Sequence, residues 1–165
     1  MRLLASLGLV AMLTGCATPL LMVAPPAPSP KVYEKKWQGR LSMTVQTQPP
    51  RAMSASFLLE GDARTGELLF YSPLGTTMAS LQWNPLTSQL IQGHQQRRFD
   101  SIEHLTEELT GAALPINAMF DWLEGTHSAA PGWQVDLSAF ADGSVVAKRS
   151  SPEPMVLLRI KLDTP

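Results

Sequence analysis

The sequence is poor in charged residues and in cysteine. Charged residues make up 16 % of the chain, well below the roughly 25 % of an ordinary soluble domain. Cys16 is the single cysteine, which excludes an internal disulfide and a zinc site built on several thiolates. The formal net charge is −1. Because no basic excess is available to neutralise phosphates, we exclude nucleic acid as a partner.

The common catalytic motifs are also missing. The sequence has three histidines, His94, His104 and His127. None has a second histidine at metal-ligand spacing, and the chain has no HExxH motif, GxSxG elbow, Walker loop or dinucleotide fingerprint. The adjacent pairs Glu107-Glu108 and Arg97-Arg98 point in different directions on a helix and on a strand, and are interpreted as surface charge. We predict no metal, no cofactor and no enzymatic activity.

The N-terminal segment has the pattern of a bacterial lipoprotein signal. Arg2 supplies a positive charge, and residues 3–13 form an apolar run that is shorter than the roughly 20 residues of a membrane span. The run ends Leu-Thr-Gly ahead of Cys16, which resembles a lipobox, so we expect lipidation at Cys16. The alternative is an ordinary signal peptide followed by a stray cysteine. Ala17, in place of an aspartate, resembles an export signal to the outer membrane.

The chain is expected to contain one folded domain. Its 165 residues, 44 % of them hydrophobic, suit a single domain with a core. Five prolines lie between residues 19 and 30, where they favour an extended polyproline tether over helix or sheet. We therefore predict a signal peptide over 1–15, a lipidated proline-rich tether over 16–31 and the folded domain over 32–165.

Most of the domain has the two-residue period of a half-buried strand. Leu41, Met43 and Val45 alternate with Ser42 and Thr44. Comparable strands are predicted at 53–60, 67–71, 76–83, 89–92, 96–99, 133–140, 144–149 and 155–162. The links between successive strands are short, so we expect an antiparallel meander.

Two short helices interrupt the strands. Asp100 is predicted to cap the first helix, with Glu103 completing a capping box, and Gly111 is suited to its end. Pro115 suits the first turn of the second helix, and Gly125 follows its end. Helices this short need tertiary packing to be stable.

These elements predict a mostly β fold. The apolar face of an antiparallel sheet must be covered, and two short helices provide little cover. We predict a curved antiparallel sheet that forms an incomplete barrel, with a helical lid over an apolar cavity suited to acyl chains. The candidate cavity residues are Phe57, Leu59, Leu81, Met119, Phe120 and Trp122. The pattern does not fix which strand face points inward, and ordinary core packing is the alternative.

Leu74 is the candidate for contact with a membrane. It lies at the tip of a predicted turn, between Pro73 and Gly75. Turn tips are normally exposed to solvent, and leucine is unfavourable there unless it meets an apolar partner. The alternative is that Leu74 folds back onto its own hairpin.

Four segments in this order resemble one family. They are WQGRLS at 37–42, LLFYSPLGTT at 68–77, LTGAALP at 109–115 and WLEG at 122–125. Together with the lipobox they are similar to the LolB family of outer-membrane lipoprotein receptors.

The resemblance implies a half-open antiparallel barrel with a helical lid. It implies a protein that is anchored by Cys16 on the periplasmic face of the outer membrane. Such a protein accepts lipoproteins from the periplasmic carrier LolA through an acyl-chain-binding cavity and inserts them into the inner leaflet. Leu74 matches the family's protruding leucine, which is implicated in insertion. We expect a monomer that uses neither nucleotide nor metal.

Two other classes of protein stay open. One is a structural or envelope-assembly lipoprotein of the outer membrane, which would have a packed core. The other is a lipid-modifying envelope enzyme, which would need a nucleophile or paired carboxylates facing the cavity. A lidded apolar cavity favours delivery, whereas a filled interior favours the scaffold.

Overall fold

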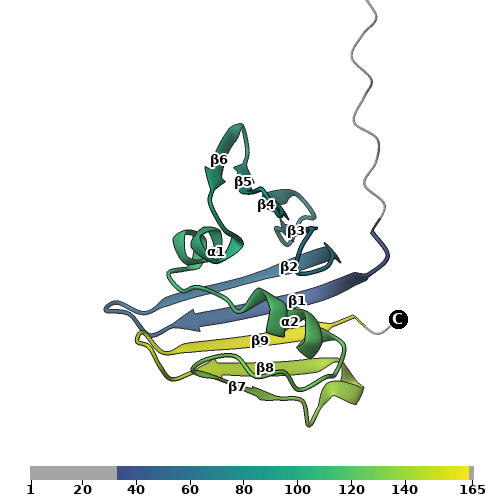
Figure 1. Ribbon diagram of the computed structural model, residues 1–165, viewed down its shortest axis with the longest axis vertical. Coiled ribbons are helices and arrows are strands. Elements are labelled where there is room, and N and C mark those ends of the chain that lie inside the picture. The colour runs from purple at the N-terminus through teal and green to yellow at the C-terminus, as the bar shows by residue number, and fades with distance from the viewer. Residues whose placement is uncertain (1–32, 164–165) are drawn as a thin grey trace, which may run out of the picture. The chain divides into compact units, whose positions relative to one another are not determined.

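The computed structural model describes residues 33–163, which form a nine-stranded antiparallel sheet and two α-helices. Cys16, the signal peptide and the whole of the predicted tether lie outside the described residues. The sheet is not closed, and its two edges are β6 and β7. The prediction of a mostly β fold with an incomplete barrel is confirmed (Figure 1).

The first six strands form the predicted meander. The strand bounds are β1 (Lys36–Val45), β2 (Arg51–Gly61), β3 (Gly66–Tyr71), β4 (Thr77–Asn84), β5 (Thr87–Gln92), β6 (Gln95–Phe99), β7 (Trp133–Asp136), β8 (Ser144–Arg149) and β9 (Val156–Leu162). β9 pairs with β1, which gives the order β6-β5-β4-β3-β2-β1-β9-β8-β7. The last strand therefore joins the first strand of the domain, so the buried apolar face runs continuously from β5 through β1 and β9 to β8.

The strands place one set of alternate residues in the core. On β1, Leu41, Met43 and Val45 are buried, while Ser42 and Thr44 are only half-buried. The inward set on β2 includes Phe57 and Leu59, and it faces the same side because Gly39 pairs with Phe57 in the register. The sequence does not determine which strand face points inward. In the structure, the inward face is the one that the helices cover.

Helix α1 (Ile102–Thr110) begins one residue later than its predicted cap implies. Ser101, not Asp100, is the N-cap: its Oγ accepts a hydrogen bond from the backbone N–H of His104 at 3.2 Å. An N-cap residue needs an extended backbone, and Ser101 has φ −147° and ψ 162°. At the other end Gly111 takes φ 83° and donates to the Glu107 carbonyl, as the sequence predicts.

Helix α2 (Ile116–Leu123) follows after a short link, and Pro115 is its N-cap residue rather than part of its first turn. The predicted strand at 133–140 is also too long. β7 ends at Asp136, whose carboxylate accepts a hydrogen bond from the backbone N–H of Ser138 at 2.9 Å. Such a side-chain turn ends a strand. A short 3₁₀ helix, η1 (Phe140–Asp142), then leads to Gly143. Neither α1 nor α2 is long and apolar enough to cross a membrane.

Candidate functional site

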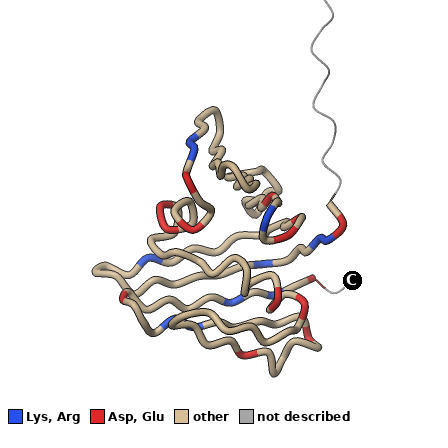
Figure 2. Tube along the Cα trace, in the orientation of Figure 1, with Lys and Arg blue, Asp and Glu red and all other residues tan. Residues whose placement is uncertain are grey.

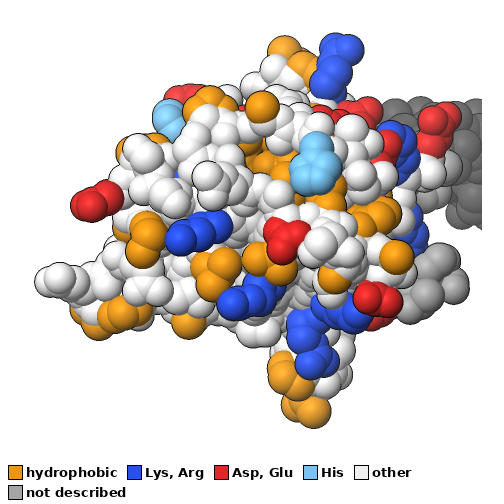
Figure 3. All heavy atoms as spheres, turned by 90° about the horizontal axis from the view of Figure 1, so that it is seen from below, with side chains coloured by type: hydrophobic (Ala, Val, Ile, Leu, Met, Phe, Trp, Pro, Cys, Tyr) orange, Lys and Arg blue, Asp and Glu red, His pale blue; other side chains and the backbone are white. Residues whose placement is uncertain are grey.

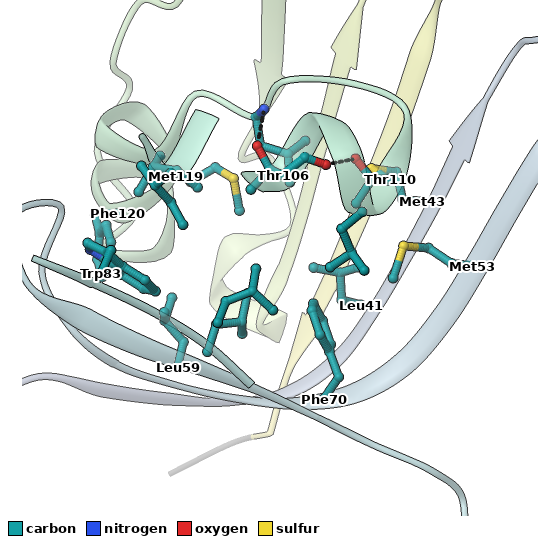
Figure 4. Close-up of a pocket in the computed structure, with 16 residues that line it drawn as sticks. Leu41, Met43, Met53, Leu59, Phe70, Trp83, Thr106, Thr110, Met119 and Phe120 are labelled. Carbon is teal, nitrogen blue, oxygen red and sulfur yellow. Dashed lines mark hydrogen bonds between the residues drawn. The ribbon is translucent and has the colours of Figure 1, made fainter. Parts of the chain in front are cut away.

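An apolar cavity lies between the sheet and the two helices (Figure 4). Strands β1 to β4 supply one wall, and α1, α2 and the link between them supply the other. The lining residues are Leu41, Met43, Met53, Leu59, Leu68, Phe70, Leu81, Trp83, Ile102, Thr106, Leu109, Thr110, Leu114, Ile116, Met119 and Phe120. We call this the lidded cavity.

The two polar side chains of the lidded cavity are turned to the backbone of the lid. The Thr106 hydroxyl donates to the Glu103 carbonyl at 2.9 Å and accepts from the Leu114 N–H at 3.1 Å. The Thr110 hydroxyl donates to the Thr106 carbonyl at 2.6 Å (Figure 4). Since these hydroxyls are satisfied within the lid, the space that they border is apolar in character.

The lining also contains no ionisable side chain. The groups whose pKa is shifted lie outside the lining of the cavity. Burial raises the pKa of Tyr33, and the backbone N–H groups of Thr65 and Arg64 lower the pKa of Asp62. Residues 33–163 contain no cluster of side chains able to hold a metal ion. The lidded cavity thus offers burial of apolar groups rather than acid–base or metal chemistry.

The lidded cavity is nearly filled by its own side chains. Its free volume is about 30 Å³, whereas pockets that hold a small molecule usually measure about 300–1,000 Å³. The surrounding side chains already fill most of the space under the lid. An acyl chain can therefore enter only if the helices move away from the sheet.

Aromatic contacts hold α2 against the sheet. The rings of Trp37 and Phe120 meet edge to face at 5.4 Å, and Trp83 lies 6.3 Å from Phe120. The Trp37 indole N–H donates to the carbonyl of Leu123 at 3.2 Å. These contacts join β1 and β4 to one helix, so they define the closed position of α2.

A second group of contacts anchors the lid beside the lidded cavity. The Trp122 indole N–H donates to the Ser128 carbonyl at 2.9 Å, and its ring lies 6.1 Å from Trp133. Arg149 is buried and donates to the carbonyls of Ala113 and Pro154 at 3.4 and 3.1 Å. Its guanidinium lies 5.9 Å from the Trp133 ring. We call Trp122, Trp133 and Arg149 the lid anchor.

The structure divides the six predicted cavity residues. Leu59, Leu81, Met119 and Phe120 line the lidded cavity. Phe57 is buried but does not line the cavity. It lies opposite Phe70 in the β2–β3 register, and Phe70 forms the cavity wall at that position. Trp122 belongs to the lid anchor. Whether the lining residues bind acyl chains stays a prediction.

Sequence reasoning missed several contributors to this region. Met43 and Met53 line the cavity, and their alternation with polar residues was a usable signal once the inward face was known. Thr106, Thr110 and Arg149 gave no such signal. Their roles depend on backbone carbonyls that only the folded chain brings near them.

One edge of the lidded cavity reaches the surface. Met53 near the start of β2 and Leu109 in the last turn of α1 are half-buried lining residues. The end of α1 lies beside β2, because a Cβ placed on Gly111 would be 3.4 Å from the Arg51 guanidinium. We call this edge the cavity mouth.

The Leu74 turn lies at the same end of the sheet as the cavity mouth. β3 ends at Tyr71, opposite Ser56, and β2 continues past it toward Met53. The Leu74 side chain is 93 % exposed, so it does not fold back onto its hairpin. The Ser72 hydroxyl accepts from the N–H groups of Leu74 and Thr76 at 3.3 Å, which fixes the turn.

A second exposed leucine provides a natural comparison. Leu86, in the turn between β4 and β5, is 92 % exposed. The eight residues of β4 separate the two turns by about 26 Å at 3.3 Å per residue. Elsewhere, on the face drawn in Figure 3, hydrophobic side chains lie mostly singly or in small groups between polar ones, which is ordinary for a protein surface.

Comparison with known proteins agrees with this geometry. The family model described as "Outer membrane lipoprotein LolB" matches residues 35–151. A protein named outer-membrane lipoprotein LolB from Bordetella petrii is 26 % identical over 181 residues, covering 96 % of this chain and 90 % of the relative. Another protein of that name, from Dechloromonas aromatica, is 33 % identical over 133 residues, covering 76 % and 67 %.

Proposed function

The chain belongs to the LolB family of outer-membrane lipoproteins, and on this premise we propose that it accepts lipoproteins from the periplasmic carrier LolA and inserts them into the outer membrane. The family has a role in lipoprotein localisation. The observation that carries the proposal is the lidded cavity, whose lining has no ionisable side chain.

Transfer between membranes requires such a site. The acyl chains of a lipoprotein cannot cross water unprotected, because burial of each methylene is favourable by about 0.8 kcal/mol. An apolar cavity hides the chains without any chemical step, so neither nucleotide nor metal is needed. The affinity of the cavity for acyl chains must exceed that of the carrier and fall below that of the bilayer.

Loading requires the lid to open. With about 30 Å³ free, the closed protein has no room for an acyl chain. The lid anchor holds α2 through hydrogen bonds of a buried indole and a buried guanidinium, whereas α1 meets the sheet through apolar side chains such as Leu105 and through one exposed ion pair, Arg97–Glu108 at 2.7 Å. Exposed ion pairs contribute little, about 0–1 kcal/mol. The α1 side is therefore the side that opens, and the half-buried residues of the cavity mouth lie along it.

The remaining assignments follow the sequence. Residues 1–15 are the signal peptide, 16–31 a tether lipidated at Cys16, and 32–165 the transfer domain, which acts as a monomer on the periplasmic face of the outer membrane. Leu74 enters the inner leaflet when cargo is released. A leucine side chain contributes about 1.5–3 kcal/mol on entering an apolar phase, enough to turn the cavity mouth toward the bilayer.

A reversible lock on the lid tests the proposal. The variant Arg97→Cys/Glu108→Cys ties α1 to β6 when it is joined by a bis-methanethiosulfonate, which forms a reducible disulfide with each thiol and releases sulfinate. Lys35→Cys/Glu124→Cys, at an exposed ion pair, ties the end of α2 to the residue before β1 in the same way. Acceptance of radiolabelled lipoprotein from LolA is measured before and after reduction. We expect the α1 lock to abolish acceptance and its reduction to restore it, whereas the α2 lock, on the side held by the lid anchor, should have a smaller effect.

The matched control places the same linker within the sheet. Lys36 and Glu60 face each other on β1 and β2 as an exposed ion pair at 3.1 Å, and Lys36→Cys/Glu60→Cys should leave acceptance unchanged. The alternative function is a structural lipoprotein with a packed core. The small free volume of the lidded cavity is the observation that favours it. A scaffold has no acceptance to lose, so absence of transfer in the unlocked protein, or full transfer while the α1 lock is in place, would contradict the proposal.

A further inference from the structure

The outer face of the sheet, opposite the lid, carries a cationic groove. Arg40, Arg159 and Lys161 border it on β1 and β9 and are exposed. Three hydroxyl side chains also line it, those of Ser42 on β1, Ser54 on β2 and Ser144 on β8. The groove is shallow, with a volume of about 460 Å³. Figure 2 shows Lys and Arg positions on the strands of this region, with acidic positions gathered at α1 and in loops.

The arrangement of the cations is unfavourable for the fold alone. Arg40 lies directly opposite Lys161 in the β1–β9 register, and like charges at opposed positions destabilise a sheet. The ion pairs of residues 33–163 involve none of the three cations. Lys161 instead donates to the backbone carbonyl of Asp142. An uncompensated cluster of this kind is expected where an anion binds.

The acidic residues near the groove are too few to neutralise it. Asp163 borders the groove, and Asp136 lies on β7 opposite Val146, in the same row as Arg159. Lys148 adds a further exposed cation on β8, in the next row of the outer face. Asp142, whose backbone Lys161 contacts, adds a third carboxylate nearby, so the four cations exceed the three carboxylates by one.

The chemistry of the groove matches phosphate. Guanidinium groups bind phosphate oxygens through paired hydrogen bonds, and serine hydroxyls can donate to the remaining oxygens. The groove has no aromatic side chain at its centre, whereas protein interfaces are usually built around buried aromatic anchors. We propose that the cationic groove binds the phosphate headgroups of anionic phospholipids and holds the domain on the membrane surface.

The strand register connects the groove to the Leu74 turn. Tyr71, the last residue of β3, lies opposite Ser56, which lies opposite Arg40 and then Lys161. Because neighbouring strands are about 4.8 Å apart, Arg40 lies about 10 Å from the start of the turn across the sheet. A headgroup site at this distance would let the groove and Leu74 engage one bilayer together. The groove does not involve the lidded cavity, so it can be tested without cargo.

The test uses the mature chain carrying Cys16→Ala, so that no acyl anchor contributes. Vesicles of phosphatidylcholine, with and without phosphatidylglycerol, are titrated, and the bound fraction is measured by flotation. We expect binding only with phosphatidylglycerol, weakening as salt is added. Arg40→Gln/Arg159→Gln should weaken it about 30-fold, since each cation near an anionic surface contributes a factor of about five.

The control Arg64→Gln/Arg98→Gln removes the same charge from exposed arginines outside the groove. It should change binding less than about threefold. Equal losses in both variants would overturn the proposal in favour of net charge alone. Binding that ignores phosphatidylglycerol, or no vesicle binding, would also overturn it, the latter in favour of an acidic protein. If millimolar inorganic phosphate fully displaced the protein from the vesicles, the ligand of the groove would be free phosphate instead of a lipid headgroup.

Discussion

The lid covers two regions that differ in what lies beneath it. Under Met119 and Phe120 the helix faces the lidded cavity, where methionines and leucines leave about 30 Å³ free. The lid anchor lies three residues after Met119 on α2. There Trp122 packs against Trp133, and the Arg149 guanidinium lies over the Trp133 ring. One short helix thus spans a site held by apolar contacts alone and a site fixed by hydrogen bonds.

This difference assigns separate tasks to the two regions. Methionine is flexible and fills irregular space, which suits a surface that must part and close again. Indole and guanidinium groups with backbone partners fix a single geometry. We infer that the lid anchor keeps α2 attached while the lidded cavity opens.

The largest expected effect is on the lid anchor. Trp122→Ala should lower the free energy of unfolding by about 3–5 kcal/mol, because a large buried aromatic is lost and leaves a void. Met119→Ala should cost less, near the lower end of about 2–5 kcal/mol, since a smaller side chain leaves a smaller void. Urea unfolding curves of both variants measure the difference. Equal losses would break the distinction between the two regions.

The next effect concerns the turn beside the cavity mouth. Leu74→Glu should still accept cargo from LolA but deliver it to membranes about 10–100-fold more slowly, because an apolar contribution of about 1.5–3 kcal/mol is lost and a carboxylate is unfavourable in hydrocarbon. A reconstituted assay that counts acceptance and membrane incorporation separately is the measurement.

Leu86→Glu is the matched control for that experiment. Leu86 is as exposed as Leu74, but it lies at the far end of β4. Delivery should stay within about twofold of the parent protein. Should both glutamate variants fail alike, exposure rather than position would be the cause. Lost acceptance in Leu74→Glu would instead assign that residue to docking or to the cavity.

The smallest effect sharpens the description of the lidded cavity itself. Met119→Leu conserves volume and should change the free energy of unfolding by less than about 1.5 kcal/mol, with acceptance retained. Met119→Gln places an amide without a partner in the apolar lining, which costs about 1–3 kcal/mol. Its acceptance should fall severalfold while circular dichroism shows an intact fold. A glutamine variant that accepts cargo normally would exclude Met119 from acyl-chain contact.

Several structural features were predictable because they depend on neighbours in sequence. The alternation around Leu41 and the short links predict the meander, and Gly111 ends α1 as expected. The helix start was wrong by one residue, since Asp100 and Ser101 are both good caps and the backbone conformation chose between them. The strand after Trp133 was predicted too long, because Asp136 forms a side-chain turn.

The sequence by itself determined most of the strands, the two short helices, the lipobox pattern at Cys16 and the place of Leu74 in a turn, since each depends on local periodicity, composition or turn chemistry. The exposure of Leu74 came from the structure. Only the tertiary structure decided that Leu59 and Met119 line one cavity while Trp122 leaves it. The same holds for Arg40 facing Lys161, 121 residues later in the chain. Both outcomes depend on strand register and helix docking, which join residues distant in sequence and are set by the packing of the whole core.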